Sequence, residues 1–193
     1  VENEVERYSS KIDEPFSKEI TIGIVEDLMS GGVQDEIKIS VNRVIDKLKA
    51  IGFNIKTINL PNVKYSIQAY YILTTAEASS NLARYDGARY GRRSKESGTV
   101  EEMYMNARTE GFGAEVKRRI MLGTYVLSSG YYDAYYKKAQ RVRRLIKGDF
   151  ENAYKEVDFI LTPTTPTTAF RIGEKIDDPL SMYLNDIFTT ASN

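Results

Sequence analysis

Three consecutive cations beside an apolar run are the first feature of this sequence that could bind a ligand. Lys117, Arg118 and Arg119 precede the run IMLG at 120–123, so at least one cation must lie against buried surface. A buried guanidinium requires an anion, because an unpaired charge inside a protein is costly. The residues alone favour an anion supplied by the protein and leave an anionic ligand as the alternative.

A second group of cations forms a run without any acid. It spans residues 137–147 and comprises Lys137, Lys138, Arg141, Arg143, Arg144 and Lys147. Such a run on a helix could bind phosphates. The solvated face of an amphipathic helix explains it better, since the formal net charge of the chain is zero and Asp149 and Glu151 follow directly.

Clustered tyrosines could stack on nucleic-acid bases. The clusters are Tyr70-Tyr71 and Tyr131-Tyr132 with Tyr135-Tyr136. Adjacent residues on a helix face different sides, so only one tyrosine of each pair can meet a common ligand. Packing in a core or an interface is therefore favoured.

The residues of nucleophilic catalysis are missing from the chain. It has no Cys and no His, and it contains neither Gly-x-Ser-x-Gly nor Ser-x-x-Lys. These absences exclude a Ser–His–Asp triad, a cysteine nucleophile, a disulfide and a zinc site built on His or Cys. We expect no catalytic residue and no metal ligand in this chain.

Two strands around one helix must position the N-terminal part. Residues 20–25 alternate and then become apolar, and residues 53–60 alternate strictly, so both are predicted strands. Between them, 34–51 has apolar residues at helical spacing and ends at Gly52, a typical residue after a helix. Such a β-α-β unit predicts parallel strands.

Helices dominate the middle of the chain, and a third strand follows them. Thr99 and Glu102 have capping-box spacing, and apolar residues predict a long amphipathic helix over about 131–156. Residues 158–162 are a predicted strand that leads into a Thr/Pro-rich loop. Asp178-Pro179 is a predicted helix start, for a short helix through Asp186.

Length and composition place these elements in one α/β domain. The chain has 193 residues, 41% hydrophobic and 28% charged, and no apolar run long enough for a membrane span. Residues 1–15 are polar and show no targeting signal. Three strands are too few for this length, so we expect residues 1–193 to be one fragment of a larger domain. Its parts are a β-α-β unit (1–62), a mainly helical part (63–157) and a strand, loop and short helix (158–193).

Five motifs carry a resemblance to a known family over nearly the whole chain. They are EASSNLARYDG at 77–87, RTEGFG at 108–113, EVKRRIMLG at 115–123, GYYDAYY at 130–136 and LTPT at 161–164. In this order they resemble the amidase-signature family, and most strongly its glutamyl-tRNA(Gln) amidotransferase A subunits. The resemblance implies a mixed sheet sandwiched by helices, of which this chain holds an incomplete part.

The resemblance also implies a reaction and a substrate pocket. The A subunits that this chain resembles would hydrolyse glutamine, and the ammonia would convert Glu-tRNA(Gln) to Gln-tRNA(Gln) for protein biosynthesis. The catalytic Lys and two Ser of the family lie in a Gly/Ser-rich segment without a counterpart here, so this chain alone is expected to be inactive. The family's Arg for the α-carboxylate corresponds to Arg119, its Asp for the α-amino group to Asp186, and a pocket Tyr to Tyr70. A guanidinium fork and a carboxylate suit the two ends of a zwitterion.

Partners and cofactors follow from the same resemblance. It implies a cytoplasmic heterotrimer with the B and C subunits of the amidotransferase, away from the membrane. The B subunit would use ATP and Mg²⁺ and hold most of the Glu-tRNA(Gln). The alternative hypothesis is a non-catalytic helical module that binds RNA or protein through residues 137–147. A steep salt dependence of tRNA binding would favour this alternative.

Overall fold

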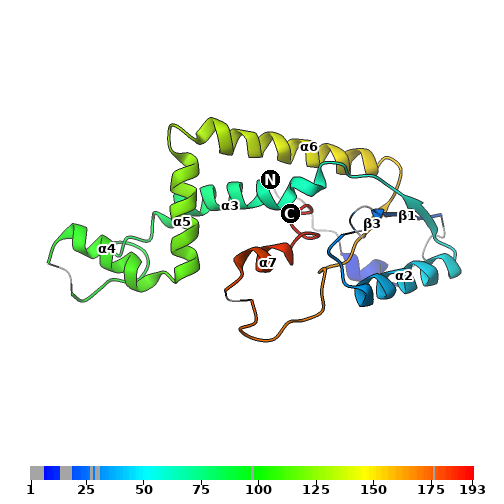
Figure 1. Cartoon of the computed structure of the whole chain (residues 1–193), viewed down its shortest axis with the longest axis horizontal. Helices are drawn as coiled ribbons and strands as arrows, with labels where there is room; N and C mark the ends of the chain where they lie inside the picture. The colour runs from blue at the N-terminus through cyan, green and yellow to red at the C-terminus, as the bar shows by residue number, and fades with distance from the viewer. Residues whose placement is uncertain (1–6, 14–18, 27, 29–30, 97, 176) are drawn as a thin grey trace.

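Three short parallel strands form a sheet at one end of the molecule, in the right-hand part of Figure 1. The computed structural model describes residues 7–13, 19–26, 28, 31–96, 98–175 and 177–193. The strands are β1 (Thr21–Ile24), β2 (Asn54–Thr57) and β3 (Phe159–Leu161), in the order β2-β1-β3. Thr21 aligns with Asn54 in the first pair, and Ile22 aligns with Phe159 in the second. The prediction of parallel strands at 20–25 and 53–60 is confirmed.

Helices cover both faces of this sheet. Helix α2 (Asp35–Ala50) packs on one face, where Ile45 joins Ile22 and Ile24 of β1 in a buried cluster. On the other face, Gly23 lies so close to Ile58 and Val157 that an added Cβ would be 2.8 Å from the Ile58 Cδ1. Gly52 follows α2 at φ 99°, as expected for a residue that ends a helix. The fold is therefore α/β, with a parallel sheet between helices.

Helices α3 (Ser66–Leu82) and α5 (Ala114–Leu127) cross near the middle of the chain, and α4 (Val100–Gly111) projects beyond them (Figure 1). The predicted capping box at the start of α4 is confirmed. The Glu102 N–H donates to the Thr99 Oγ1 at 3.1 Å, and the Thr99 N–H donates to Glu102 Oε2 at 3.0 Å. The short 3₁₀ helices η1 (Tyr8–Lys11) and η2 (Val63–Tyr65) precede these elements.

The predicted helix over 131–156 is wrong in one respect, because it is not a single α-helix. Its first part is the π-helix η3 (Tyr132–Lys137), and α6 (Lys138–Ala153) continues from it. The buried Ile146 and Ala153 of α6 form a cluster with Val25, Ile58 and Val157, which lie next to the three strands in sequence. The hydrophobic stripe was thus predicted correctly, and the widened first turn was not.

The last helix, α7 (Pro179–Leu184), begins as predicted, because Asp178 Oδ1 accepts the Ser181 N–H at 3.0 Å. It ends before Asp186, which lies in the turn that follows. In the part of the chain that the structure describes, no helix is long and apolar enough to cross a membrane. Most of the polar segment 1–15 lies outside the described residues.

Candidate functional site

The three residues predicted to bind a ligand come from three different helical segments. Tyr70 lies on α3, Arg119 on α5, and Asp186 two residues beyond the end of α7. Figure 1 shows α5 crossing the end of α3, with α7 below α3 and to the right of α5. Side-chain contacts connect all three segments, as described next, so one region holds all three residues.

The anion that Arg119 requires is Glu115, one turn earlier on α5. The Arg119 Nε donates to Glu115 Oε1 at 2.9 Å, and Arg118 Nη1 donates to Oε2 at 2.5 Å. A third donor comes from α7, where the Tyr183 hydroxyl donates to the same Oε1 at 3.1 Å. One carboxylate thus accepts hydrogen bonds from two guanidinium groups and one phenol.

The electrostatics of this pair favour its charged form. Burial by itself pushes the pKa of Glu115 upward, but the hydrogen bonds from Arg119 and Tyr183 outweigh it and lower that pKa. Burial likewise opposes the charge of Arg119, and the hydrogen bond and charge of Glu115 raise the pKa of Arg119 above its ordinary value. Arg119 therefore carries a permanent positive charge at the surface of the site.

The Arg119 side chain keeps its terminal nitrogens for a further partner. Only the Nε donates to Glu115, and among the described residues neither Nη group forms a hydrogen bond. The side chain is 43% exposed. A guanidinium can bind a carboxylate with two parallel N–H···O bonds, so this free end is suited to one.

Tyr71 is a neighbour of the predicted residues, and their charges shift its pKa. Its ring stacks at a tilt on the Tyr183 ring, with centroids 4.2 Å apart, and Tyr70 meets its edge at 5.2 Å. Burial, followed by the negative charge of Asp186, raises the pKa of Tyr71 to about 12, and the positive charge of Arg119 opposes this shift. Both predicted charges therefore act on one phenol. Ring contacts and a hydrogen bond thus bring the segments that carry Tyr70, Arg119 and Asp186 together beside Tyr71.

The crossing of α3 and α5 sets the separation of Tyr71 and Arg119. At this crossing Gly123 lies directly on the backbone of α3, and an added Cβ would stand 2.0 Å from the Thr75 carbonyl oxygen. Tyr71 and Arg119 each precede these contact residues by one turn, about 6 Å along the helix axis. The Thr75 hydroxyl also donates to the Tyr71 carbonyl oxygen at 2.6 Å.

The segment after α7 fixes the backbone of Asp186. Its carbonyl oxygen accepts the N–H of Thr190 at 2.9 Å and the Thr190 hydroxyl at 3.0 Å. Thr190 is buried, and its hydroxyl lies 3.4 Å from that of Ser66 at the start of α3. Phe188, between Asp186 and Thr190 in the sequence, is also buried. Asp186 is thus attached to the helix that carries Tyr70 and Tyr71.

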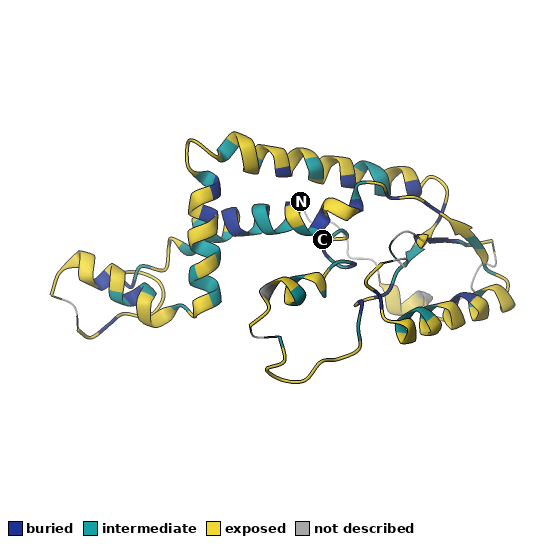
Figure 2. Cartoon of the chain, viewed as in Figure 1, coloured by how far each residue is buried: buried dark blue, intermediate teal, exposed yellow. Residues whose placement is uncertain are grey.

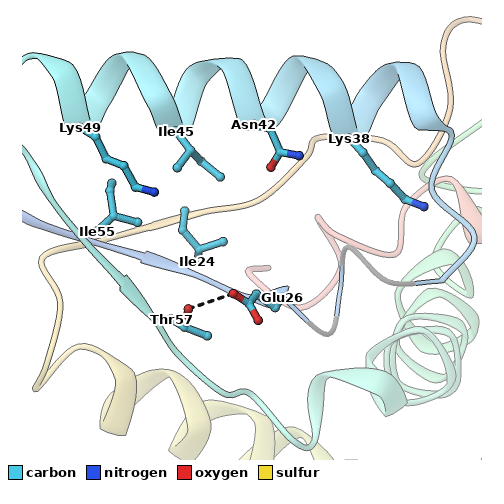
Figure 3. Close-up of a pocket in the computed structure, with 8 residues that line it drawn as sticks. All are labelled: Ile24, Glu26, Lys38, Asn42, Ile45, Lys49, Ile55 and Thr57. Carbon is cyan, nitrogen blue, oxygen red and sulfur yellow. Dashed lines mark hydrogen bonds between the residues drawn. The ribbon is translucent and has the colours of Figure 1, made fainter.

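Among the described residues, cavities also lie elsewhere, and two of them contain none of the predicted residues. The larger, about 430 Å³, lies between α2 and the sheet, where Figure 3 shows side chains of α2 pointing toward the strands. The hydrogen bond drawn there joins the Thr57 hydroxyl to Glu26 Oε1 at 3.1 Å. The lining residues are Ile24, Glu26, Lys38, Asn42, Ile45, Lys49, Ile55 and Thr57. A second cavity, about 320 Å³, adjoins the motif at 77–87 and includes Glu77, Ser80 and Asn81.

The basic run over 137–147 lies mainly on the outer face of η3 and α6, which Figure 2 shows as largely exposed. Lys137 pairs with Asp133 at 2.7 Å and Lys147 with Glu151 at 3.4 Å. Among the described residues, the cations between them have no ion pair. This placement matches the solvated helix face that the sequence favoured.

The tyrosine clusters divide as expected from helix geometry. Tyr131 and Tyr135 gather with Tyr125 on one side, and their ring centroids lie 4.2 to 6.2 Å apart. Tyr132 stacks instead on Tyr136 at 5.1 Å, and Tyr136 packs against the buried cluster of α3 and α6. Packing thus accounts for Tyr132 and Tyr136, one member of each adjacent pair.

The sequence reasoning missed three members of the site, which are Glu115, Tyr183 and Tyr71. Glu115 and Arg119 are four residues apart in the part predicted to be mainly helical, and this spacing was a signal for an ion pair. No comparable signal pointed to Tyr183, whose partner is 68 positions away.

Comparison with known proteins defines the class. The family model described as Amidase matches residues 2–193, and the chain belongs to the amidase family. The A subunit of a glutamyl-tRNA(Gln) amidotransferase from Koribacter versatilis is 55% identical over 189 residues, which are 98% of this chain and 39% of that protein. The corresponding A subunit of Persephonella marina is 56% identical over 192 residues, 100% of this chain and 39% of the relative.

Solved structures agree with this assignment. The crystal structure of the glutamyl-tRNA(Gln) amidotransferase A subunit from Thermotoga maritima matches at 35% identity and a TM-score of 0.63, over 90% of this chain and 32% of that one. A crystal structure of an amidase with 17% identity and a TM-score of 0.63 shares the fold, over 92% of this chain and 37% of that one. The chain spans about two fifths of the length of the two curated relatives, 39% of each.

Proposed function

We propose that this chain forms the part of an amidotransferase A subunit that holds the α-carboxylate and α-amino groups of glutamine. In this proposal the Nη groups of Arg119 bind the carboxylate and Asp186 binds the ammonium, with Tyr70 beside them. The observation that carries it is the hydrogen bond from Tyr183 to Glu115, which brings the segment of Asp186 against the helix of Arg119. An α-amino acid presents two charges on one carbon, so it needs two opposite charges held close together.

The reaction proposed for the whole subunit is glutamine hydrolysis, which supplies ammonia for the conversion of Glu-tRNA(Gln) to Gln-tRNA(Gln). The relatives named as A subunits of glutamyl-tRNA(Gln) amidotransferase support this role. The Gly/Ser-rich segment that carries the family's catalytic Lys and two Ser has no counterpart in this chain, so the nucleophile would belong to the remaining part of the subunit. The proposal includes the B and C subunits as partners in the cytoplasm, with ATP, Mg²⁺ and most tRNA contacts belonging to the B subunit.

Side-by-side assays of the assembled enzyme test this function. Gln-tRNA formation is measured once with glutamine and once with ammonium as the nitrogen donor. Truncating one partner of a buried charge pair costs about 2–5 kcal/mol. This site is partly exposed, so we expect Arg119→Lys to weaken glutamine use by about 2 kcal/mol, because an ammonium cannot form the bidentate fork. The ammonium reaction should be unchanged.

Arg141→Lys is the matched control, since Arg141 lies on the exposed face of α6. It should leave both reactions at the parental level. An equal loss in both reactions for Arg119→Lys, or parental glutamine use, would contradict the assignment of Arg119.

The exposed cations of α6 support one competing function, a module that binds RNA directly. A salt titration of tRNA binding by the assembled enzyme, with and without Arg141→Ala and Arg144→Ala, distinguishes the two. Loss of two phosphate contacts would reduce the slope of log affinity against log salt by about 2. The amidotransferase proposal expects no change.

A further inference from the structure

The hydrogen bond between Tyr183 and Glu115 joins the two charged sides of the site. Tyr183 lies on α7 and Glu115 on α5, 68 positions apart, and the hydroxyl-to-carboxylate distance is 3.1 Å. The same Glu115 Oε1 accepts the Arg119 Nε at 2.9 Å. A single oxygen atom therefore connects the helix that carries Arg119 to the helix that precedes Asp186.

Tyr183 restrains Asp186 from the N-terminal side, as Thr190 does from the C-terminal side. The Asp186 N–H donates to the Tyr183 carbonyl oxygen at 3.2 Å, so the two residues belong to one continuous turn. The Tyr183 ring also contacts Tyr71 at 4.2 Å, which places it between α3 and α5. The hydrogen bond of Tyr183 to Glu115 therefore restrains the turn that carries Asp186.

The ammonium and carboxylate of an α-amino acid are bonded to the same carbon, so their spacing is invariant. A site that selects such a molecule must keep its own two charges at a matching spacing. Arg119 is held by Glu115 at its Nε, which orients the free Nη groups, and Asp186 is held through Tyr183. Both restraints end at the Glu115 carboxylate.

We infer that Glu115 and Tyr183 are positioning residues that set the spacing of Arg119 and Asp186 and so select amides that carry an α-amino group. This inference rests on the proposed glutamine site and adds the determinant of its selectivity. Neither residue needs to touch the substrate. Both act through the residues that do.

Tyr183→Phe is the variant that removes the hydrogen bond and keeps the ring on Tyr71. Ammonia release by the assembled enzyme is measured with glutamine and with glutaramic acid, which is glutamine without its α-amino group. We expect KM for glutamine to rise about 10-fold, as for loss of a hydrogen bond to a charged group. KM for glutaramic acid should stay near the parental value, because this substrate does not use Asp186. The preference for glutamine then falls about 10-fold.

Two further variants separate positioning from folding. Glu115→Gln keeps an oxygen that can accept from Tyr183, so it should retain most of the preference for glutamine, whereas Glu115→Ala should lose it. Tyr154→Phe is the control, because Tyr154 is an exposed tyrosine beyond α6 whose side chain has no hydrogen bond among the described residues. It should change neither KM.

The outcomes distinguish this inference from the proposed function. A parental preference for glutamine in Tyr183→Phe, together with a weakened glutamine reaction in Arg119→Lys, overturns the inference alone. Parental glutamine use in Arg119→Lys and Asp186→Asn overturns the proposed site itself. An equal fall of kcat for both substrates and for ammonium in Tyr183→Phe would show a structural role and also overturn the inference.

Discussion

Replacing Gly123 by Ala should separate the two helices that form the site. The new Cβ would stand 2.0 Å from the Thr75 carbonyl oxygen, 2.6 Å from its carbonyl carbon and 2.7 Å from the Ser79 hydroxyl oxygen. Real Cβ atoms essentially never approach a neighbour closer than 3.0 Å. Two of the three obstacles are backbone atoms, so a rotamer change cannot relieve the clash. The axes of α3 and α5 must move apart by about 1 Å or more.

The expected energy follows from two opposing effects. Alanine favours a helix over glycine by about 1 kcal/mol. Overpacking a tight contact costs about 1–3 kcal/mol, and sometimes more. A backbone clash of this depth belongs at the upper end, so we expect a net loss of about 2–3 kcal/mol. Because Tyr71 and Arg119 lie one turn from the crossing, a shift of about 1 Å should also lower the glutamine-dependent rate, by up to about 100-fold.

Gly148→Ala provides the matched control. Gly148 is also inside a helix, α6, but an added Cβ there has no neighbour within 4 Å. This variant should gain about 0.5–1 kcal/mol from helix propensity. The measurement is the thermal unfolding midpoint of the full-length subunit, together with its glutamine and ammonium reactions. Equal midpoints for the two variants would refute the close approach of α3 and α5 at Gly123.

Three further predictions concern a helix start, a titrating phenol and a turn. Thr99→Ala removes the N-cap that accepts from Glu102, so the free energy of unfolding should fall by about 1 kcal/mol, measured by urea denaturation. Burial raises the pKa of Tyr71 to about 12, and an unfolded tyrosine ionises near 10, so the parent should lose stability as the pH rises from 10 to 12. Tyr71→Phe should show a smaller loss, and identical unfolding midpoints against pH would contradict this. Gly87 has φ 81° and an added Cβ would be 2.8 Å from the Cβ of Ala107, so Gly87→Ala should destabilise by about 1–3 kcal/mol in the same urea assay.

Local signals in the sequence predicted most of the elements. Alternation at 20–25 and 53–60, and the spacing of Thr99 with Glu102, depend on neighbours in the chain, and the structure confirms them. The widened turn of η3 was not predictable, because apolar periodicity over one turn does not distinguish a π-helix from an α-helix. The α/β class was predictable because the alternation that marks the strands is also a local pattern.

The candidate site was predictable only in part. The apolar run after Arg119 predicted a cation against buried surface, but Met121 and Leu122 are exposed and Arg119 is only partly buried. Glu115, one turn before Arg119, is visible in the sequence. The contact of Tyr183 with Glu115 depends on how α7 packs on α5, which no local pattern encodes. The assignment of Arg119, Asp186 and Tyr70 to glutamine stays a prediction.

The central position of β1 has a consequence for synthesis on the ribosome. Its Thr21 N–H donates to Asp158 Oδ2 at 2.8 Å, across 137 positions of sequence. Among the described strands, one edge of β1 can pair with β2 early, whereas β3, the partner of the other edge, emerges later. At about 5–20 residues per second, that delay lasts about 7–27 s. During this time the open edge of β1 is a template for pairing with another chain. The strand order therefore requires that nascent β1 be protected until β3 emerges.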